Sequence, residues 1–426
     1  MAVRGFWLAA LLATNADLAV LRDDYVQKGR AFTPETRRAA LDYVASLEPR
    51  AASLTSAEFL IAVAKTTALA DNGHDSWHPG KGAWLPERAP LRFLWFPDAL
   101  VIARAAPAQQ DLLGARVTAI DGHSVEELFE RLRPLAGGIE DHRRWNLSFY
   151  PETAELLHAL GLAASPDRLT ISLALANGRE ATREIEMLPR NGTPRGESPA
   201  RLMSGLHSGN EPLYLQDTDR RFRAVDLPAI GASYLQFRSH QGTDAEPIED
   251  FLRAAREHLA QAKPENLIVD LRFDGGGNID PTVEFFKGLA AAVPGRIYVI
   301  VSRLTFSAGI VAAALIEQSA GDRAMIVGEP VGDRLRFWSE GKPACLPESK
   351  YCVQVTDGAW NLVNGCAQEA GCYGDAYRVK VPDLDPDLAA PLTAGSWLAG
   401  TDPAMTAIEA HLWSCKSCRP EPGDGE

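Results

Sequence analysis

Two short loops in the second half of the chain carry residue types that can act on a carbonyl group. One is 274–278, which contains three consecutive glycines, and the other is 305–309, which places Ser307 between small residues. Glycines that follow a buried strand permit positive φ angles and close approach of the backbone, and amides that open onto a helix can point at a developing anion. This pattern favours an oxyanion hole next to a serine nucleophile.

Each loop also has a simpler interpretation. The glycine loop can be a tight turn or a phosphate-binding loop, although it lacks the spaced glycines and the Gly-Lys-Ser/Thr of a nucleotide site. A serine at the start of a helix is an ordinary N-cap, and the local pattern around Ser307 alone favours that role. The two loops by themselves therefore leave the chemistry open.

A serine hydroxyl is a poor nucleophile until a base takes its proton, and histidine is the natural base near neutral pH. His74 lies just beyond a predicted helix that begins at the capping box Thr55-x-x-Glu58 and ends at Asn72-Gly73. Taken alone, a histidine in that position is more often structural. A catalytic role would require His74 to come within hydrogen-bond reach of Ser307, which is distant in the sequence.

The elements that would position these loops form a repeating pattern after about residue 225. Buried strands are predicted at 267–272, 297–301 and 324–328, and helices at 281–292 and 307–317. Alternating strands and helices predict a parallel sheet, with the functional loops at the carboxyl ends of its strands. Both loops would lie at that edge.

Shorter apolar stretches between Gly, Pro and Asp predict a β-rich region before this core. Within it, residues 113–132 predict a strand, an Asp-Gly turn and a short helix, similar to part of a PDZ-type peptide-binding module. Residues 190–210 are polar and rich in Gly, Pro and Ser, as expected of a linker. The predicted organisation is a signal peptide at 1–16, a helical segment at 17–84, a PDZ-like region at 85–190, a linker or mobile loop at 191–224, an α/β core at 225–412 and a tail at 413–426.

Composition excludes several classes of function. A chain of 426 residues exceeds what one hydrophobic core usually supports, so two or three domains are expected. The net charge of -13 removes the overall attraction that drives binding to nucleic acids or anionic membranes. No apolar run reaches the roughly 18 residues that suggest a membrane span. Partners should be neutral or cationic.

The N-terminus and the cysteines favour export. Residues 1–16 contain one basic residue, an apolar stretch and then small residues, which is typical of a secretory signal, although a plain helix is an alternative. Six clustered cysteines indicate disulfides between near neighbours and a periplasmic or secreted protein. A zinc site at the Cys415-x-x-Cys418 motif is less favoured, because only His411 is near. The cysteines are Cys345, Cys352, Cys366, Cys372, Cys415 and Cys418.

The motifs of the second half resemble those of the C-terminal-processing and tricorn-like serine peptidases. The resemblance rests on LIVDLRFDGGGN, VIVSRLTFSAGIVAAALIEQ and AMIVGEPVGD within 267–340. It extends to the Asp-Asn-Gly-His of 71–74 and to 381–383 and 399–403, so it covers most of the chain from about 17 to 412. It implies an α/β fold with a ClpP/crotonase-like core, an N-terminal helical segment and a smaller PDZ-like region.

The resemblance also implies roles for individual residues. Ser307 matches the nucleophile and His74 matches the base of the tricorn-like branch. The amide of Ala308 and that of Gly276 or Gly277 match the oxyanion donors.

One position departs from the processing-protease branch, which uses a lysine base. The segment 328–334 ends here in Arg334, whose pKa is too high to accept the serine proton. A Ser-Lys dyad is therefore not expected.

A third group should orient the imidazole. The tricorn-like pattern indicates Asp375, seven residues before Pro382, with Glu369 as the alternative, although either can be a surface acid. Asp75 and Ser76 adjoin His74 and are further candidates. The glycine loop is expected to be shaped by Asp270, Arg272 and Asp274.

The resemblance implies a serine peptidase that hydrolyses extended or unfolded peptides through an acyl-enzyme and needs no metal or organic cofactor. Fold does not guarantee chemistry, so a catalytically inactive peptide-binding protein is one alternative. Another is a crotonase-type enzyme that uses the glycine-loop amides on a thioester without a serine nucleophile. Covalent labelling of Ser307 separates the peptidase from both.

Overall fold

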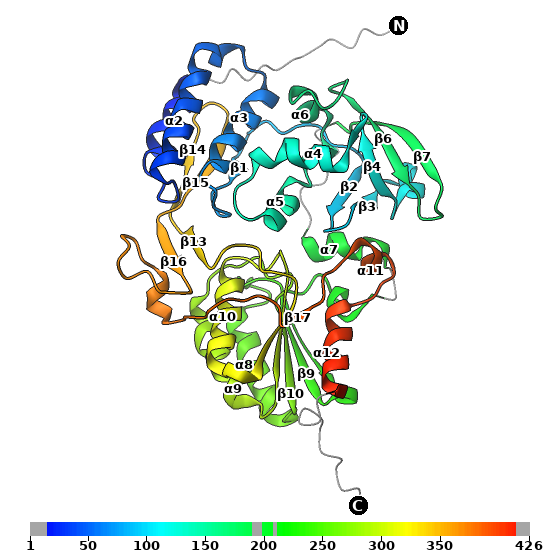
Figure 1. The fold of residues 1–426 in the computed structure, drawn as a ribbon, viewed down its shortest axis with the longest axis vertical. Helices are drawn as coiled ribbons and strands as arrows, with labels where there is room; N and C mark the ends of the chain where they lie inside the picture. Colours follow the sequence, from blue (N-terminus) through cyan, green and yellow to red (C-terminus); the bar gives the residue numbers. More distant parts are fainter. Residues whose placement is uncertain (1–14, 190–197, 208–210, 415–426) are drawn as a thin grey trace, which may run out of the picture.

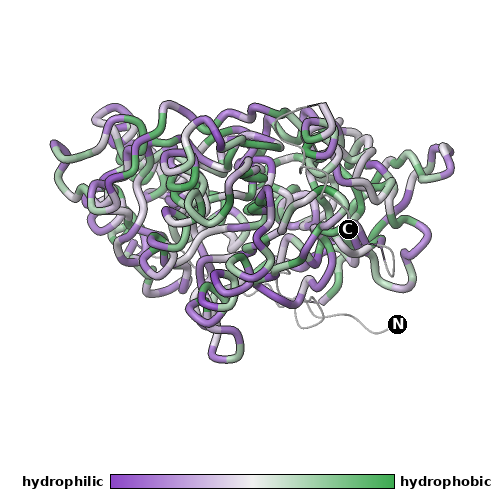
Figure 2. The backbone as a smooth tube through the Cα atoms, turned by 90° about the horizontal axis from the view of Figure 1, so that it is seen from below, coloured by the Kyte–Doolittle hydropathy of each residue, from purple (hydrophilic) through white to green (hydrophobic). Residues whose placement is uncertain are grey.

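The structure is a computed structural model, and it describes residues 15–189, 198–207 and 211–414. Helices and an antiparallel sheet from the first half of the chain lie at one end, and an α/β unit from the second half lies at the other (Figure 1). Hydrophilic stretches follow the peripheral loops (Figure 2). The mixed α/β fold that the sequence predicts is confirmed at this level.

The N-terminal region is helical: α1 is Asn15–Val20, α2 is Pro34–Leu47 and α3 is Ser56–Ala68. The expected helix start at Thr55 is confirmed, because α3 begins at a capping box built on this residue, and α2 begins at a second capping box built on Thr33. Helix α3 ends at Ala68, several residues before the expected Asn72-Gly73, and Asp71 in the following segment has a left-handed φ of 49°.

The middle region is an antiparallel sheet in the order β2-β3-β4-β6-β7, with β5 paired to β4. The predicted strand, Asp-Gly turn and helix are confirmed as β4, the turn at 121–122, β5 and α4. The strands are β2 Leu91–Trp95, β3 Leu100–Ala105, β4 Arg116–Ile120, β5 His123–Ser124, β6 Arg168–Ala174 and β7 Glu180–Glu186, and the helices are α4 Val125–Leu132, α5 Glu140–Leu147 and α6 Ala154–Ala159.

One hydrophobic core joins the N-terminal helices to this sheet. It also includes Leu346, Tyr351 and Val353, from the hairpin that the second half of the chain sends back to the helices. The hairpin consists of β14 (Lys342–Cys345) and β15 (Tyr351–Val355) and pairs with β1 (Trp77–Pro79). The segment just after His74 is therefore fixed to a distant part of the sequence.

Part of the predicted linker is structured. Helix α7 (Pro199–Met203) buries Ala200 and Met203 against a cluster that contains Trp397 of α11 (Ala394–Leu398). Residues 190–197 and 208–210 lie outside the described residues.

The α/β unit contains a six-stranded sheet in the order β17-β12-β11-β10-β9-β8. All neighbours are parallel except β8 and β9, which confirms the predicted parallel sheet. The expected strands at 297–301 and 324–328 have the observed bounds. The strands are β8 Phe222–Leu227, β9 Ala232–Phe237, β10 Asn266–Asp270, β11 Ile297–Val301, β12 Ala324–Gly328 and β17 Leu388–Ala389.

Helices cover both faces of this sheet (Figure 1). Successive strand residues point to opposite faces, so Leu267 and Val269 pack in the cluster of α8, α9 and α10, whereas Ile268 packs with α12. No described helix is long and apolar enough to cross a bilayer. The helices are α8 Ile248–Ala262, α9 Val283–Ala292, α10 Ala308–Ala320 and α12 Pro403–Ser414.

Two disulfides join near neighbours, as the spacing of the cysteines predicts. Cys345 and Cys352 are cross-strand partners in β14 and β15, and Cys366 bonds to Cys372 after the pair β13 (Arg336–Ser339) and β16 (Gly358–Asn361). The predicted tail cysteines and almost all of the predicted signal peptide lie outside the described residues.

Candidate active site

Three loops meet at the carboxyl edge of the core sheet, after β10, β11 and β12. The amide of Phe306 donates to the carbonyl of Asp274 at 2.9 Å, and the amide of Gly332 donates to the carbonyl of Thr305 at 2.8 Å. The hydroxyl of Thr305 donates to the carbonyl of Leu271 at 2.8 Å. These bonds hold the glycine loop, the serine loop and the loop after β12 in one frame.

Ser307 stands at the head of α10 in a strained conformation, with φ 53° and ψ −122°. Non-glycine residues avoid this region, which costs about 1–3 kcal/mol and is found mainly at functional sites. The side chain makes no capping hydrogen bond to the helix. The ordinary N-cap interpretation of Ser307 therefore does not describe this structure.

Gly276 packs directly against the serine. A Cβ atom at Gly276 would lie 2.6 Å from Cβ of Ser307, and its φ is +100°. Its amide already donates to Oδ1 of Asp274 at 3.0 Å. Of the two glycines considered as oxyanion donors, Gly277 is therefore the one whose amide is not bound by Asp274, and it lines a cavity together with Ser307 and Ala308.

A fully buried pair supports the glycine loop from behind. Nδ1 of His240 lies 2.8 Å from Oδ2 of Asp274, and both side chains have no exposed surface. The backbone amide of His240 donates to the carbonyl of Gly276 at 2.8 Å. Asp274 shapes the loop as expected, whereas nothing in the sequence around His240 marks this residue.

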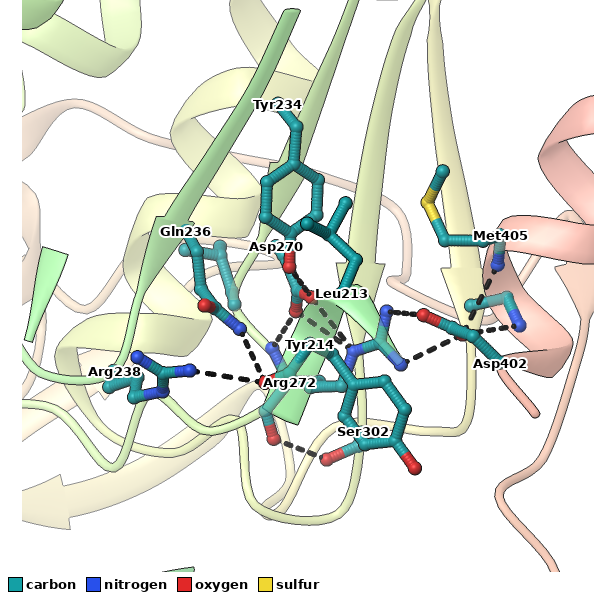
Figure 3. Close-up of polar contacts among 12 residues, drawn as sticks. Leu213, Tyr214, Tyr234, Gln236, Arg238, Asp270, Arg272, Ser302, Asp402 and Met405 are labelled. Carbon is teal, nitrogen blue, oxygen red and sulfur yellow. Dashed lines mark hydrogen bonds and ion pairs between the residues drawn. The ribbon is translucent and has the colours of Figure 1, made fainter. Parts of the chain in front are cut away.

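A second buried network holds the start of the glycine loop (Figure 3). The guanidinium of Arg272 forms two bonds to Asp402, at 2.9 and 3.0 Å, and a third to Asp270. Asp270 also accepts from the hydroxyl of Tyr234 at 2.5 Å. Since Asp402 accepts from the first amides of α12, including that of Met405, this network fixes the end of β10 to α12.

The loop that carries His74 is held from both sides. The side chain of Asn72 donates to the carbonyl of Trp338 at 2.8 Å and accepts from its amide at 3.0 Å. Asp75 accepts from the hydroxyls of Tyr25 and Thr356 at 3.0 and 2.8 Å. Asp75 thus ties the loop to its surroundings instead of facing the His74 ring.

The His74 ring lies against Phe306 of the serine loop and Phe337 of β13. Its centroid is 4.3 Å from that of Phe306, the residue before Ser307, and 5.3 Å from that of Phe337. Both ring nitrogens are buried without a hydrogen-bond partner, so the ring is not bonded to Ser307 in this structure. Burial lowers the pKa of His74 to about 3, with a smaller contribution from the nearby His142. The imidazole is therefore neutral near pH 7.

The carboxylate beside His74 is Asp333. Its Oδ2 lies 3.9 Å from Nδ1 of His74, its side chain is 1% exposed, and burial raises its pKa to about 6. Gly73 makes room for this approach, because a Cβ there would lie 2.7 Å from the same oxygen. The sequence patterns do not single out Asp333, although it precedes Arg334 in a segment that carries the resemblance.

The acids that the sequence indicates have other partners. Asp375 accepts from the amide of Cys366 at 2.8 Å, and Glu369 pairs with Arg336 at 3.0 Å. No contact between either acid and His74 is found in the described part of the chain. Arg334 donates to the carbonyl and to the carboxylate of Asp71, both at 2.8 Å.

The fold has known relatives in structure but not in sequence: no protein-family model and no curated protein matches the chain. The structure is similar to mature CPAF complexed with lactacystin, with a TM-score of 0.62, 11% identity and coverage of 96% of this chain and 99% of that chain. This chain has the fold of CPAF. Mature CPAF alone gives a TM-score of 0.59 at 12% identity, with 98% and 99% covered.

The CPAF fold covers the helices, the middle sheet and the α/β core together. A further match is the photosystem II D1 C-terminal processing protease, with a TM-score of 0.40, 15% identity and coverage of 95% of this chain and 98% of that chain. At the level of the fold, the similarity to CPAF agrees with the resemblance to C-terminal-processing and tricorn-like serine peptidases.

Proposed function

We propose that this chain is a serine peptidase with Ser307 as its nucleophile. The observation that carries the proposal is the strained backbone of Ser307, at the head of a buried helix, beside a glycine loop and a cavity. Strain of this kind projects a side chain toward substrate in other hydrolases, where the serine lies on a sharp strand-to-helix turn. The shared CPAF fold supports the proposal.

The proposed reaction is acyl transfer. Oγ of Ser307 attacks the peptide carbonyl while His74 accepts the hydroxyl proton, and the amides of Gly277 and Ala308 donate to the oxyanion. His74 then gives the proton to the leaving amine, and the C–N bond breaks. A water that transfers its proton to His74 attacks the ester, and the acid product leaves as Ser307 regains a proton.

His74 can accept the serine proton because it is neutral near pH 7 and its ring nitrogens are unoccupied. The burial that lowers its pKa to about 3 also disfavours the imidazolium. Catalytic hydrogen bonds are often long in a free enzyme and tighten when substrate binds, so the missing bond to Ser307 is compatible with this role. The imidazolium that forms needs a neighbouring anion, and we assign that role to Asp333 rather than to Asp375.

This assignment predicts the pH dependence of the reaction. Burial raises the pKa of Asp333 to about 6, so the carboxyl group is neutral below that pH and cannot stabilise the imidazolium. Activity should therefore rise as pH increases through about 6. In Asp333→Asn, kcat/KM should fall by about 100-fold or more and the rise should disappear, as measured by pH–rate profiles.

The matched variant is Asp375→Asn, which changes the acid that the sequence indicated. If Asp333 orients His74, Asp375→Asn should keep the rise near pH 6. A profile that loses this rise in Asp375→Asn and keeps it in Asp333→Asn would transfer the role to Asp375.

The substrates we propose are extended or unfolded peptides. The cavity beside Ser307 is lined by the glycine loop, the start of α10 and residues of β13 and β16, and we expect backbone hydrogen bonds to hold an extended chain there. The core would be of the ClpP/crotonase type and the middle sheet a PDZ-like peptide-binding region. The two disulfides fit a periplasmic or secreted location.

Hydrolysis of a reduced and alkylated protein tests this function. Mass spectrometry of the products should show new peptide termini, and the same substrate in its folded state should be cut more slowly. The contradicting result would be an unfolded substrate that stays intact after long incubation. It counts against peptidase activity if Ser307 of the same protein sample reacts with a serine-directed probe.

A further inference from the structure

The cavity beside Ser307 is lined by aromatic, apolar and acidic side chains. Its volume is about 320 Å³, and its lining includes the aromatic residues Phe337, Trp360 and Tyr373. The Phe337 and Trp360 rings are stacked with centroids 5.8 Å apart, and Trp360 and Tyr373 lie 5.4 Å apart at an angle of 49°. Tyr373 is 40% exposed, so one ring of this group remains accessible from solvent.

One acid, Glu340, also lines the cavity. Its carboxylate accepts from the hydroxyl of Ser339 at 2.9 Å, and no lysine, arginine or histidine of residues 15–189, 198–207 and 211–414 forms an ion pair with it. Its backbone is held in a left-handed conformation, with φ 53°, directly after β13. The turn therefore places an exposed carboxylate, without an ion-pair partner among the described residues, on the wall of the cavity that Ser307 also lines.

We propose that this cavity binds a lysine or arginine side chain of the substrate, at the residue whose carbonyl group Ser307 attacks. The proposal rests on the peptidase function proposed above. The Phe337 and Trp360 rings are buried and stacked on other rings, so the exposed ring of Tyr373 is the one whose negative face can attract a cation. The carboxylate of Glu340 adds charge complementarity. The aliphatic stem of such a side chain can pack on Ile279 and Val311 while its charged end meets Glu340 and the ring of Tyr373.

Other side chains fit the cavity less well. An acidic side chain would meet the charge of Glu340, and a hydrocarbon side chain would use the apolar walls but leave the carboxylate without a partner. Norleucine is the informative comparison, because it has the same unbranched stem as lysine without the ammonium group. The ratio of kcat/KM for the lysine peptide to kcat/KM for the norleucine peptide therefore measures what the charge contributes.

The test uses internally quenched peptides that differ only at this residue, carrying lysine, arginine, norleucine or glutamate. In the wild-type chain, kcat/KM for lysine should exceed that for norleucine by about tenfold or more. The lysine-to-norleucine ratio should fall by about tenfold in Glu340→Gln, in line with the loss of one charge pair. It should not change in Glu180→Gln, which alters an exposed acid on β7.

A second readout separates this proposal from the peptidase function. Calorimetric titration of the Ser307→Ala protein with the lysine and norleucine peptides measures binding without any chemistry. Tighter binding of the lysine peptide that Glu340→Gln weakens would support the pocket even if the wild-type chain cleaves nothing. Equal or tighter binding of the norleucine peptide, or a preference that Glu340→Gln leaves unchanged, would overturn it.

Discussion

Gly276→Ala is expected to lower kcat/KM by about 100-fold or more, as large an effect as the loss of an oxyanion donor. A methyl group at this position would lie 2.6 Å from Cβ of Ser307 and 3.1 Å from the Ala308 amide, and the backbone φ of +100° disfavours any side chain. Either the glycine loop or Ser307 must move, and the geometry between nucleophile and donors is lost. The loss is measured as the ratio of kcat/KM between wild type and Gly276→Ala, in steady-state kinetics on any peptide that the wild-type chain cleaves.

The preceding glycine offers a matched control. A Cβ at Gly275 would meet no atom within 4 Å, and its φ lies outside the left-handed region. Gly275→Ala should therefore keep kcat/KM within about twofold of wild type, which corresponds to a surface effect of about 0.5 kcal/mol. Equal losses in both variants would mean that the loop acts through flexibility rather than through close packing on Ser307.

His74→Ala is expected to lower kcat by about 10⁴-fold or more, because the serine loses the only base assigned to it. The control is His78→Ala, which removes an exposed histidine from β1 of the same segment and should be nearly silent. Both variants are to be compared in steady-state hydrolysis and in thermal unfolding.

Unfolding data matter because His74 also packs against Phe306 and Phe337, so its removal leaves a cavity. Imidazole added to the folded His74→Ala protein should restore part of the rate, which a purely structural role would not allow. Activity of the folded variant within tenfold of wild type would exclude His74 as the base.

Much of the fold could be predicted from local patterns. Strands β11 and β12 are short runs rich in apolar and β-branched residues, bounded by glycine, proline or polar residues, so both were expected with their observed bounds. The starts of α2 and α3 were predictable because Thr33 and Thr55 satisfy backbone amides of the first turn. These features depend on residues close together in the sequence.

The acid beside His74 and the buried pair of His240 and Asp274 could not be predicted from local patterns. Asp333 reaches His74 only because Gly73 leaves space for it and because the loop after β12 is bonded to the serine loop. His240 meets Asp274 across neighbouring strands β9 and β10, and the register of that pairing is a property of the folded sheet. Spacing from a terminal motif favoured Asp375, whose carboxylate instead binds the amide of Cys366.

The central claim is that Ser307 is an activated nucleophile. The most direct measurement is intact-mass analysis after treatment with a fluorophosphonate, on wild type, Ser307→Ala and Ser319→Ala, the last of which alters a serine near the end of the same helix. The proposed chemistry predicts one adduct in wild type and in Ser319→Ala, and none in Ser307→Ala. No adduct on the folded wild-type chain, or an adduct that persists in Ser307→Ala, would contradict it.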